Sequence, residues 1–176
     1  MNWHESRAQL PPAQPFWAVV QCFGNGYEFS RPGDTREPTF DEERAATMAA
    51  LAEGATGIIY HCMHSLQRSP RFEERFAELD RIAAEVRDLT PVLAQVDARE
   101  QAVVQSGTLS VLTKGGRSSC WVILASTLRE DQDVVLRLPS GCTRATDRAT
   151  GERLPVRRGR LHLRFRALDA RVLHVR

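Results

Sequence analysis

Side chains that could bind or cleave a sugar follow two short apolar segments within the first 64 residues. They are an amide, two aromatic rings, two imidazoles and a carboxyl group: Gln21, Phe23, Glu28, Tyr60, His61 and His64. Cleavage of a glycosidic bond by acid–base chemistry needs two carboxyl groups about 5 to 9.5 Å apart. Glu28, between Tyr27 and Phe29, is the candidate catalytic carboxyl group, and a solvated loop position is the alternative for it.

Gln21 comes late in an otherwise apolar segment, where a buried amide without a partner would cost about 1 to 3 kcal/mol. We therefore expect Gln21 to face either a neighbouring loop or a ligand rich in hydroxyl groups. Tyr60 could stack on a sugar ring, and His61 and His64 could hydrogen-bond its hydroxyl groups. Structural roles are the alternative for these three side chains.

Other chemistries are disfavoured by spacing and by missing motifs. His61 and His64 flank Cys62 and are zinc-type ligands, but on a strand they would point to opposite faces, so no metal site is predicted. The sequence has no GxSxG, Walker or GxGxxG motif, which removes serine hydrolase, P-loop and dinucleotide readings as first choices, and no cofactor is predicted. Residues 142–176 hold ten arginines but one aromatic residue, Phe165. Single-strand binders interleave aromatic with basic side chains, so no nucleic acid partner is predicted.

The elements that must position the candidate side chains can be read from the apolar pattern. Phe16–Phe23 and Gly57–Met63 are short apolar runs that gain polar groups only near their ends, which is typical of strands buried on both faces of a parallel sheet. Between them, Thr39 and Glu42 form a capping box that starts a helix, and Gly54 ends it. Ligands of parallel β/α folds meet the carboxyl ends of strands, where these candidates lie.

A second helix and a set of short strands follow. Ser69 is the expected N-cap, with Pro70 at the first helical position and Pro91 closing the helix. Its apolar face is formed by residues at spacings of three, four and seven: Phe72, Phe76, Leu79, Ile82, Ala83, Val86 and Leu89. Beyond Asp97, segments rich in Val, Leu, Ile and Thr alternate with turn signals, which favours an antiparallel sandwich. These segments are 102–113, 118–127, 133–138, 142–147, 160–165 and 170–175.

The predicted fold class is therefore α/β plus all-β. Residues 1–96 are expected to form a partial (β/α) barrel of two βα units, and residues 97–176 an antiparallel β-sandwich. The charge pattern agrees with two units: the 24 basic and 22 acidic residues give a net charge of +2, but residues 1–100 carry −6 and residues 101–176 carry +8.

The sequence also predicts where in the cell the protein is located. No segment approaches the roughly 18 apolar residues needed to span a bilayer, so no membrane partner is predicted. The residues from Met1 to Glu5 lack the pattern of a signal peptide, so a cytoplasmic protein is expected. The four cysteines are far apart without a CxxC pair, and we expect them to be reduced and mostly buried.

Three segments carry a family resemblance: Pro15–Gly24, Glu37–Arg44 and Ala49–Tyr60. Together they resemble the C-terminal end of a glycoside-hydrolase-like TIM barrel, in which strands seven and eight are followed by a C-terminal β-sandwich. The resemblance implies carbohydrate as the ligand. In the retaining enzymes of this kind the nucleophilic glutamate ends strand seven, where this chain has Gln21, and the general acid lies on strand four, which has no counterpart here. An amide cannot be the nucleophile.

The length sets the functional expectation. A complete (β/α)8 barrel needs about 250 residues, and this chain has 176. We therefore expect the C-terminal fragment of a glycoside-hydrolase-like protein, inactive alone, whose barrel is completed by an upstream segment or another chain. The alternative is a noncatalytic carbohydrate-binding or structural interaction module. An exposed Trp121 would favour that module, but its apolar run CWVILA predicts a core position.

Overall fold

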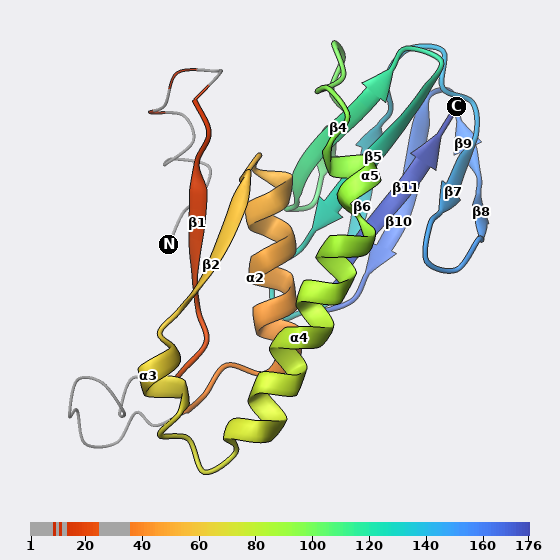
Figure 1. Cartoon of the computed structure of the whole chain (residues 1–176). Coiled ribbons are helices and arrows are strands. Elements are labelled where there is room, and N and C mark those ends of the chain that lie inside the picture. The colour runs from red at the N-terminus through yellow and green to blue at the C-terminus, as the bar shows by residue number, and fades with distance from the viewer. Residues whose placement is uncertain (1–8, 10, 12–13, 25–35) are drawn as a thin grey trace.

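The computed structural model describes residues 9, 11, 14–24 and 36–176. Its first layer is a pair of parallel strands, β1 (Trp17–Gln21) and β2 (Gly57–His61), joined through helix α2 (Phe40–Ala52). Their register aligns Trp17 with Gly57 and Gln21 with His61, so the two strands end at the same level. Figure 1 shows α2 and the longer helix α4 between this pair and the sandwich.

Helix α2 begins as the sequence predicts. The Thr39 hydroxyl accepts from the Glu42 N–H at 3.2 Å, and the Glu42 carboxylate accepts from the Thr39 N–H at 2.9 Å. This capping box satisfies two backbone donors that the first turn leaves free. Helix α2 presents small side chains to β1, where Ala18 packs with Ala50 and Ala55.

The second helix departs from its predicted start. Helix α4 spans Phe72–Asp88, because the Ser69 hydroxyl accepts from the Arg71 N–H at 3.0 Å and so stabilises a turn that precedes the helix. Two short helices also occupy predicted non-helical positions, α3 (Met63–Leu66) and α5 (Thr90–Leu93). Pro91 lies in the first turn of α5 and does not end the preceding helix, which is consistent with the tolerance of early helical positions for proline.

Two antiparallel sheets make up the rest of the chain. One has the order β3-β6-β10-β9, with β3 (Val103–Ser106), β6 (Gln132–Arg137), β10 (Arg160–Phe165) and β9 (Val156–Arg157). The other has the order β4-β5-β11-β7-β8, with β4 (Ser110–Gly116), β5 (Ser119–Ala125), β11 (Ala170–Val175), β7 (Ala145–Asp147) and β8 (Arg153–Leu154). The predicted sandwich is confirmed. The predicted segment 102–113 divides into β3 and β4, which belong to different sheets, and the two-residue strands β8 and β9 were not predicted.

Alternating side chains from both sheets fill the sandwich core. Val122 and Leu124 of β5, Leu136 of β6 and Leu161 of β10 are all fully buried there. Cys120 and Cys142 are buried in the same core, and Cys22 is buried beneath β1. Three of the four cysteines therefore occupy the buried positions that the sequence predicts.

A second apolar layer joins the helices to the five-stranded sheet. Met48 of α2 and Val92 of α5 pack with Ile123 of β5 and Val172 of β11 in one buried cluster. Ion pairs reinforce this contact, including Glu42–Arg129 at 2.6 Å, Asp88–Arg148 at 2.8 Å and Asp97–Lys114 at 2.7 Å. In each of these pairs the acid comes from the negative part of the sequence and the base from the positive part.

One prediction about β1 was wrong. Its side chains alternate between exposed and buried positions, so only one face is covered. Ala18 and Val20 are buried against the helices, but Trp17 and Val19 on the other face are 66% and 42% exposed. Ile59 of β2 continues this exposed apolar face. An apolar run predicts burial but cannot show whether a second layer is present in the same chain.

Candidate functional site

Three of the predicted site residues meet where β1 and β2 end. Gln21 and His61 are opposite each other in the parallel register, and both side chains are exposed. The Gln21 Nε2 donates to the Phe23 carbonyl at 2.8 Å. The Phe23 ring, itself buried, meets the His61 ring edge-on, with the ring centroids 5.6 Å apart. An exposed amide and an exposed imidazole thus form one small polar surface at the carboxyl ends of parallel strands, with the buried Phe23 ring packed against the imidazole.

The other predicted residues lie elsewhere. Tyr60 is on the opposite face of β2, where its hydroxyl lies 3.0 Å from the Thr47 hydroxyl of α2 and burial raises its pKa. His64 is exposed on α3. The candidate catalyst Glu28 falls outside the described residues. Gln21, Phe23 and His61 are therefore the candidates that the structure brings together.

A buried charged network lies behind the end of β1 and was not predicted. Arg75 of α4 and Glu43 of α2 form an ion pair at 2.5 Å, and both side chains are fully buried. The other end of the guanidinium contacts Glu78. The pKa of Glu43 is raised to about 7, mainly because burial disfavours its charged form; Arg75 opposes this shift, and the charges of Glu78 and Glu37 add to it. The only sequence signal for this network was Glu43 itself, a glutamate in an Ala-rich helix. Helical spacing alone does not show whether such a residue is buried or exposed.

Three atoms of this network are buried without a hydrogen-bond partner among the described residues. They are Glu37 Oε1, Glu43 Oε2 and Arg75 Nε. Such atoms cost free energy unless water or another group satisfies them. The network is therefore a polar interior next to Cys22, whose pKa burial and Glu43 raise to about 12.

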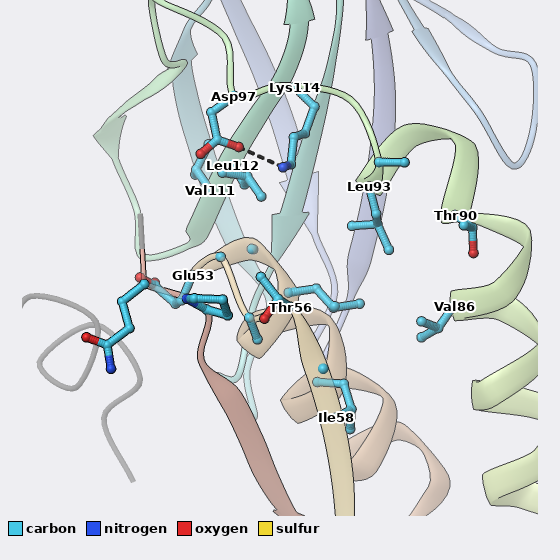
Figure 2. A pocket seen from close by; sticks show the side chains of 18 of the residues that line it. Glu53, Thr56, Ile58, Val86, Thr90, Leu93, Asp97, Val111, Leu112 and Lys114 are labelled. Carbon is cyan, nitrogen blue, oxygen red and sulfur yellow. Dashed lines mark ion pairs between the residues drawn. The ribbon is translucent and has the colours of Figure 1, made fainter. Parts of the chain in front are cut away.

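A cleft lies between β2, the C-terminal end of α2, the helices α4 and α5, and strand β4. This cleft has a volume of about 960 Å³, near the upper end of the range typical of ligand pockets. Figure 2 shows Ile58 of β2, Val86 of α4, Leu93 of α5 and Val111 and Leu112 of β4 around it. The Asp97–Lys114 ion pair lies on its rim. The cleft thus lies beside the buried cluster through which the helices pack on the five-stranded sheet.

Trp121 does not provide an exposed aromatic platform on the sandwich. It is partly buried against the Met48 and Ile123 cluster, and its ring stacks on His174 with centroids 4.3 Å apart. Within the described ranges, no three His, Cys, Asp or Glu side chains gather closely enough to hold a metal ion. In the same part of the chain, no helix has the length and apolar character that crossing a membrane requires.

Comparison with known proteins gives structural matches only. No family model matches the sequence, and no curated protein matches it. One similar structure is an α-amylase from Geobacillus thermoleovorans, solved with acarbose. The match covers 98% of this chain and 42% of the amylase chain, at 14% identity and a TM-score of 0.60. A GH27 β-L-arabinopyranosidase from Geobacillus stearothermophilus matches 98% of the chain with 39% of its own, at 12% identity and a TM-score of 0.58. An α-fucosidase from Thermotoga maritima matches 94% with 40% of its own, at 13% identity and a TM-score of 0.55.

These matches define the class of fold. The neighbours are glycoside hydrolases: an α-amylase, a GH27 β-L-arabinopyranosidase and an α-fucosidase. The chain spans about two fifths of the length of the structures that it matches. Its fold is that of part of a glycoside-hydrolase-like protein, and the predicted resemblance is confirmed at the level of fold.

Proposed function

We propose that the chain is the C-terminal part of a glycoside-hydrolase-like protein that acts on carbohydrate. Residues 1–96 would supply the last two βα units of a TIM barrel, and residues 97–176 the C-terminal sandwich. The parallel pair of β1 and β2 with α2 between them is the repeating unit of such a barrel. The glycoside hydrolases of similar fold support carbohydrate as the ligand class.

The observation that carries this proposal is the uncovered apolar face of β1 and β2. In a closed barrel each strand is paired on both sides and its inner side chains fill the interior. In the described part of the chain β1 pairs with β2 alone, and Trp17, Val19 and Ile59 remain exposed. Further strands, from an upstream segment or another chain, would pair with the free edges and cover these side chains.

Gln21, Phe23 and His61 would then stand at the mouth of the completed barrel. The amide of Gln21 and the imidazole of His61 suit the hydroxyl groups of a sugar, and the buried Phe23 ring packs against that imidazole. Gln21 occupies the place where a carboxylate nucleophile would be needed, and an amide cannot perform that step. The chain alone is therefore proposed to be inactive, and its contribution to be positioning of the sugar.

Activity of the chain with and without its complement tests this proposal. The purified chain is assayed on a panel of aryl glycosides, and then again when joined to the reading frame encoded immediately upstream. We expect hydrolysis only from the joined protein, and a lower kcat/KM when Gln21→Ala or His61→Ala is introduced there. Hydrolysis by the isolated chain that is lost in Glu28→Gln would refute inactivity of the fragment.

A further inference from the structure

Three arginines stand side by side on the outer face of the four-stranded sheet. The register places Arg137 of β6 opposite Arg160 of β10, and Arg160 opposite Arg157 of β9. The next pair along the two strands, Leu136 and Leu161, is fully buried in the core. Because neighbouring strand residues point to opposite faces, the arginine side chains lie on the outer face. All three are exposed. Neighbouring strands lie about 4.8 Å apart, so this arginine row presents one guanidinium group per strand.

The arginine row carries charge that the described residues leave largely uncompensated. Like charges directly opposite each other destabilise a sheet. Arg137 has one acidic neighbour, Glu100, at 3.5 Å, and Arg157 and Arg160 have no ion pair in the part of the chain that the structure describes. At the other end of β10 the situation differs, because Arg164 lies 3.5 Å from Asp131 and 3.6 Å from Asp133. The positive charge is thus concentrated at one end of the sheet.

A cavity of about 320 Å³ adjoins the arginine row. Its wall includes Arg137, the segment 138–143, and Arg158 and Gly159 of the turn between β9 and β10. Arg158 adopts a φ of 51° there, a conformation that side-chain-bearing residues rarely adopt. The turn therefore adds a fourth arginine to the same end of the sheet, beside a hollow at the lower end of the size range of ligand sites.

We propose that the arginine row binds an acidic polysaccharide through the carboxylate groups of its uronic acid units. A guanidinium group binds a carboxylate through two parallel hydrogen bonds, and a polyuronate offers one carboxylate per sugar along an extended chain. The bound anion would relieve the repulsion among the arginines. The saccharide nature of this ligand rests on the proposed function; its negative charge rests on the arginine row alone.

A nucleic acid fits this surface less well. Single-stranded nucleic acids are held by aromatic stacking together with basic groups. The aromatic residue of β10, Phe165, is completely buried in the sandwich core. The outward-facing neighbours of the arginine row include Val103 of β3, Val135 of β6 and His162 of β10, none of which is an aromatic ring of the kind on which bases stack in such proteins. Charge without stacking favours a carboxylate-bearing chain.

Binding of a polygalacturonate oligomer to the chain tests the proposal. Titration calorimetry compares the unmodified chain with the double variant Arg157→Gln/Arg160→Gln, and with the control Arg144→Gln/Arg153→Gln. The control removes the same charge from exposed positions next to and on the other sheet. We expect the first variant to lose about tenfold or more in affinity, because charge-assisted hydrogen bonds are lost, and the control to stay within about twofold. A neutral oligosaccharide of equal length should not bind the arginine row.

Two outcomes of the titration would overturn the proposal. Equal loss of affinity in both double variants would show diffuse attraction to net charge and would overturn the proposal. So would equal or tighter binding of single-stranded DNA of matched charge, which would assign the surface to nucleic acid. We expect the first variant to fold as the unmodified chain does, because the substitutions remove repulsion, and circular dichroism of each variant checks this. The outcome is independent of the hydrolysis assay, since the binding test needs no barrel complement.

Discussion

Glu43 illustrates how one buried residue can govern the response of the protein to pH. Its carboxyl group is fully buried against Arg75, and burial outweighs that guanidinium and raises the pKa from 4.5 to about 7. The native protein therefore keeps a proton that the unfolded chain releases near pH 4.5. Because the unfolded state binds fewer protons between these values, the contribution of Glu43 to the free energy of unfolding falls as the pH rises from about 4.5 to about 7.

Glu43→Gln should flatten this dependence. Urea unfolding at several pH values between about 5 and 7 is expected to show a smaller decline in stability for the variant than for the unmodified protein, because the amide does not titrate. Glu130→Gln, on an exposed turn, is the matched control and should keep the original slope. Parallel slopes for Glu43→Gln and the unmodified protein would show that Glu43 ionises at the same pH in both states.

At the scale of elements, helix α2 connects the two parts of the chain through its packing contacts. One side of α2 packs on β1 and the other on β5 and β11, so the helix contacts both the parallel strand pair and the five-stranded sheet. Met48 is 1% exposed within the second contact. Because the cluster joins the two parts of the chain, a cavity there should weaken both of them.

Met48→Ala is expected to lower the free energy of unfolding by about 2 to 5 kcal/mol through lost burial and a residual cavity. Met63→Ala, at a position 45% exposed on α3, should change it by about 0.5 kcal/mol or less. Circular dichroism and tryptophan fluorescence are expected to follow one transition for both variants. Two separate transitions would mean that the helical layer and the sandwich unfold independently.

At the scale of the whole molecule, the most consequential feature is an apolar sheet face without a cover. Trp17, Val19 and Ile59 share this face, and β1 and β2 have free edges in the described part of the chain. Exposed edges with apolar side chains promote pairing with other chains. The chain should therefore associate with itself when its complement is absent.

Val19→Lys should reduce this association, because a charge on an exposed strand opposes edge pairing. Sedimentation velocity is expected to show fewer associated species for the variant across a concentration series, with little change in thermal stability. Val96→Lys places the same charge at a site 77% exposed outside β1 and β2 and should leave association unchanged. An equal reduction by both substitutions would indicate a general effect of charge.

Much of the local structure was predictable from the sequence. Thr39 and Glu42 specify the start of α2 because a capping box depends on residues three apart, and alternation such as that of Leu161 to Phe165 specifies a strand that faces a core on one side. The resemblance of the chain to part of a glycoside-hydrolase-like protein was confirmed by the fold of the structural neighbours. Capping boxes and strand alternation depend on residues close together in the sequence, so they can be recognised without knowing which segments pack together.

The tertiary structure decided what depends on contacts between distant segments. It separated Tyr60 from Gln21 and His61, because neighbouring strand residues point to opposite faces. It buried Glu43 against Arg75, and it aligned Arg137, Arg160 and Arg157 across three strands. The sequence by itself determined the longer helices and most strands, but not the short elements α3, α5, β8 and β9. Strand register and layer packing determined which side chains share a surface, because both depend on residues far apart in the chain.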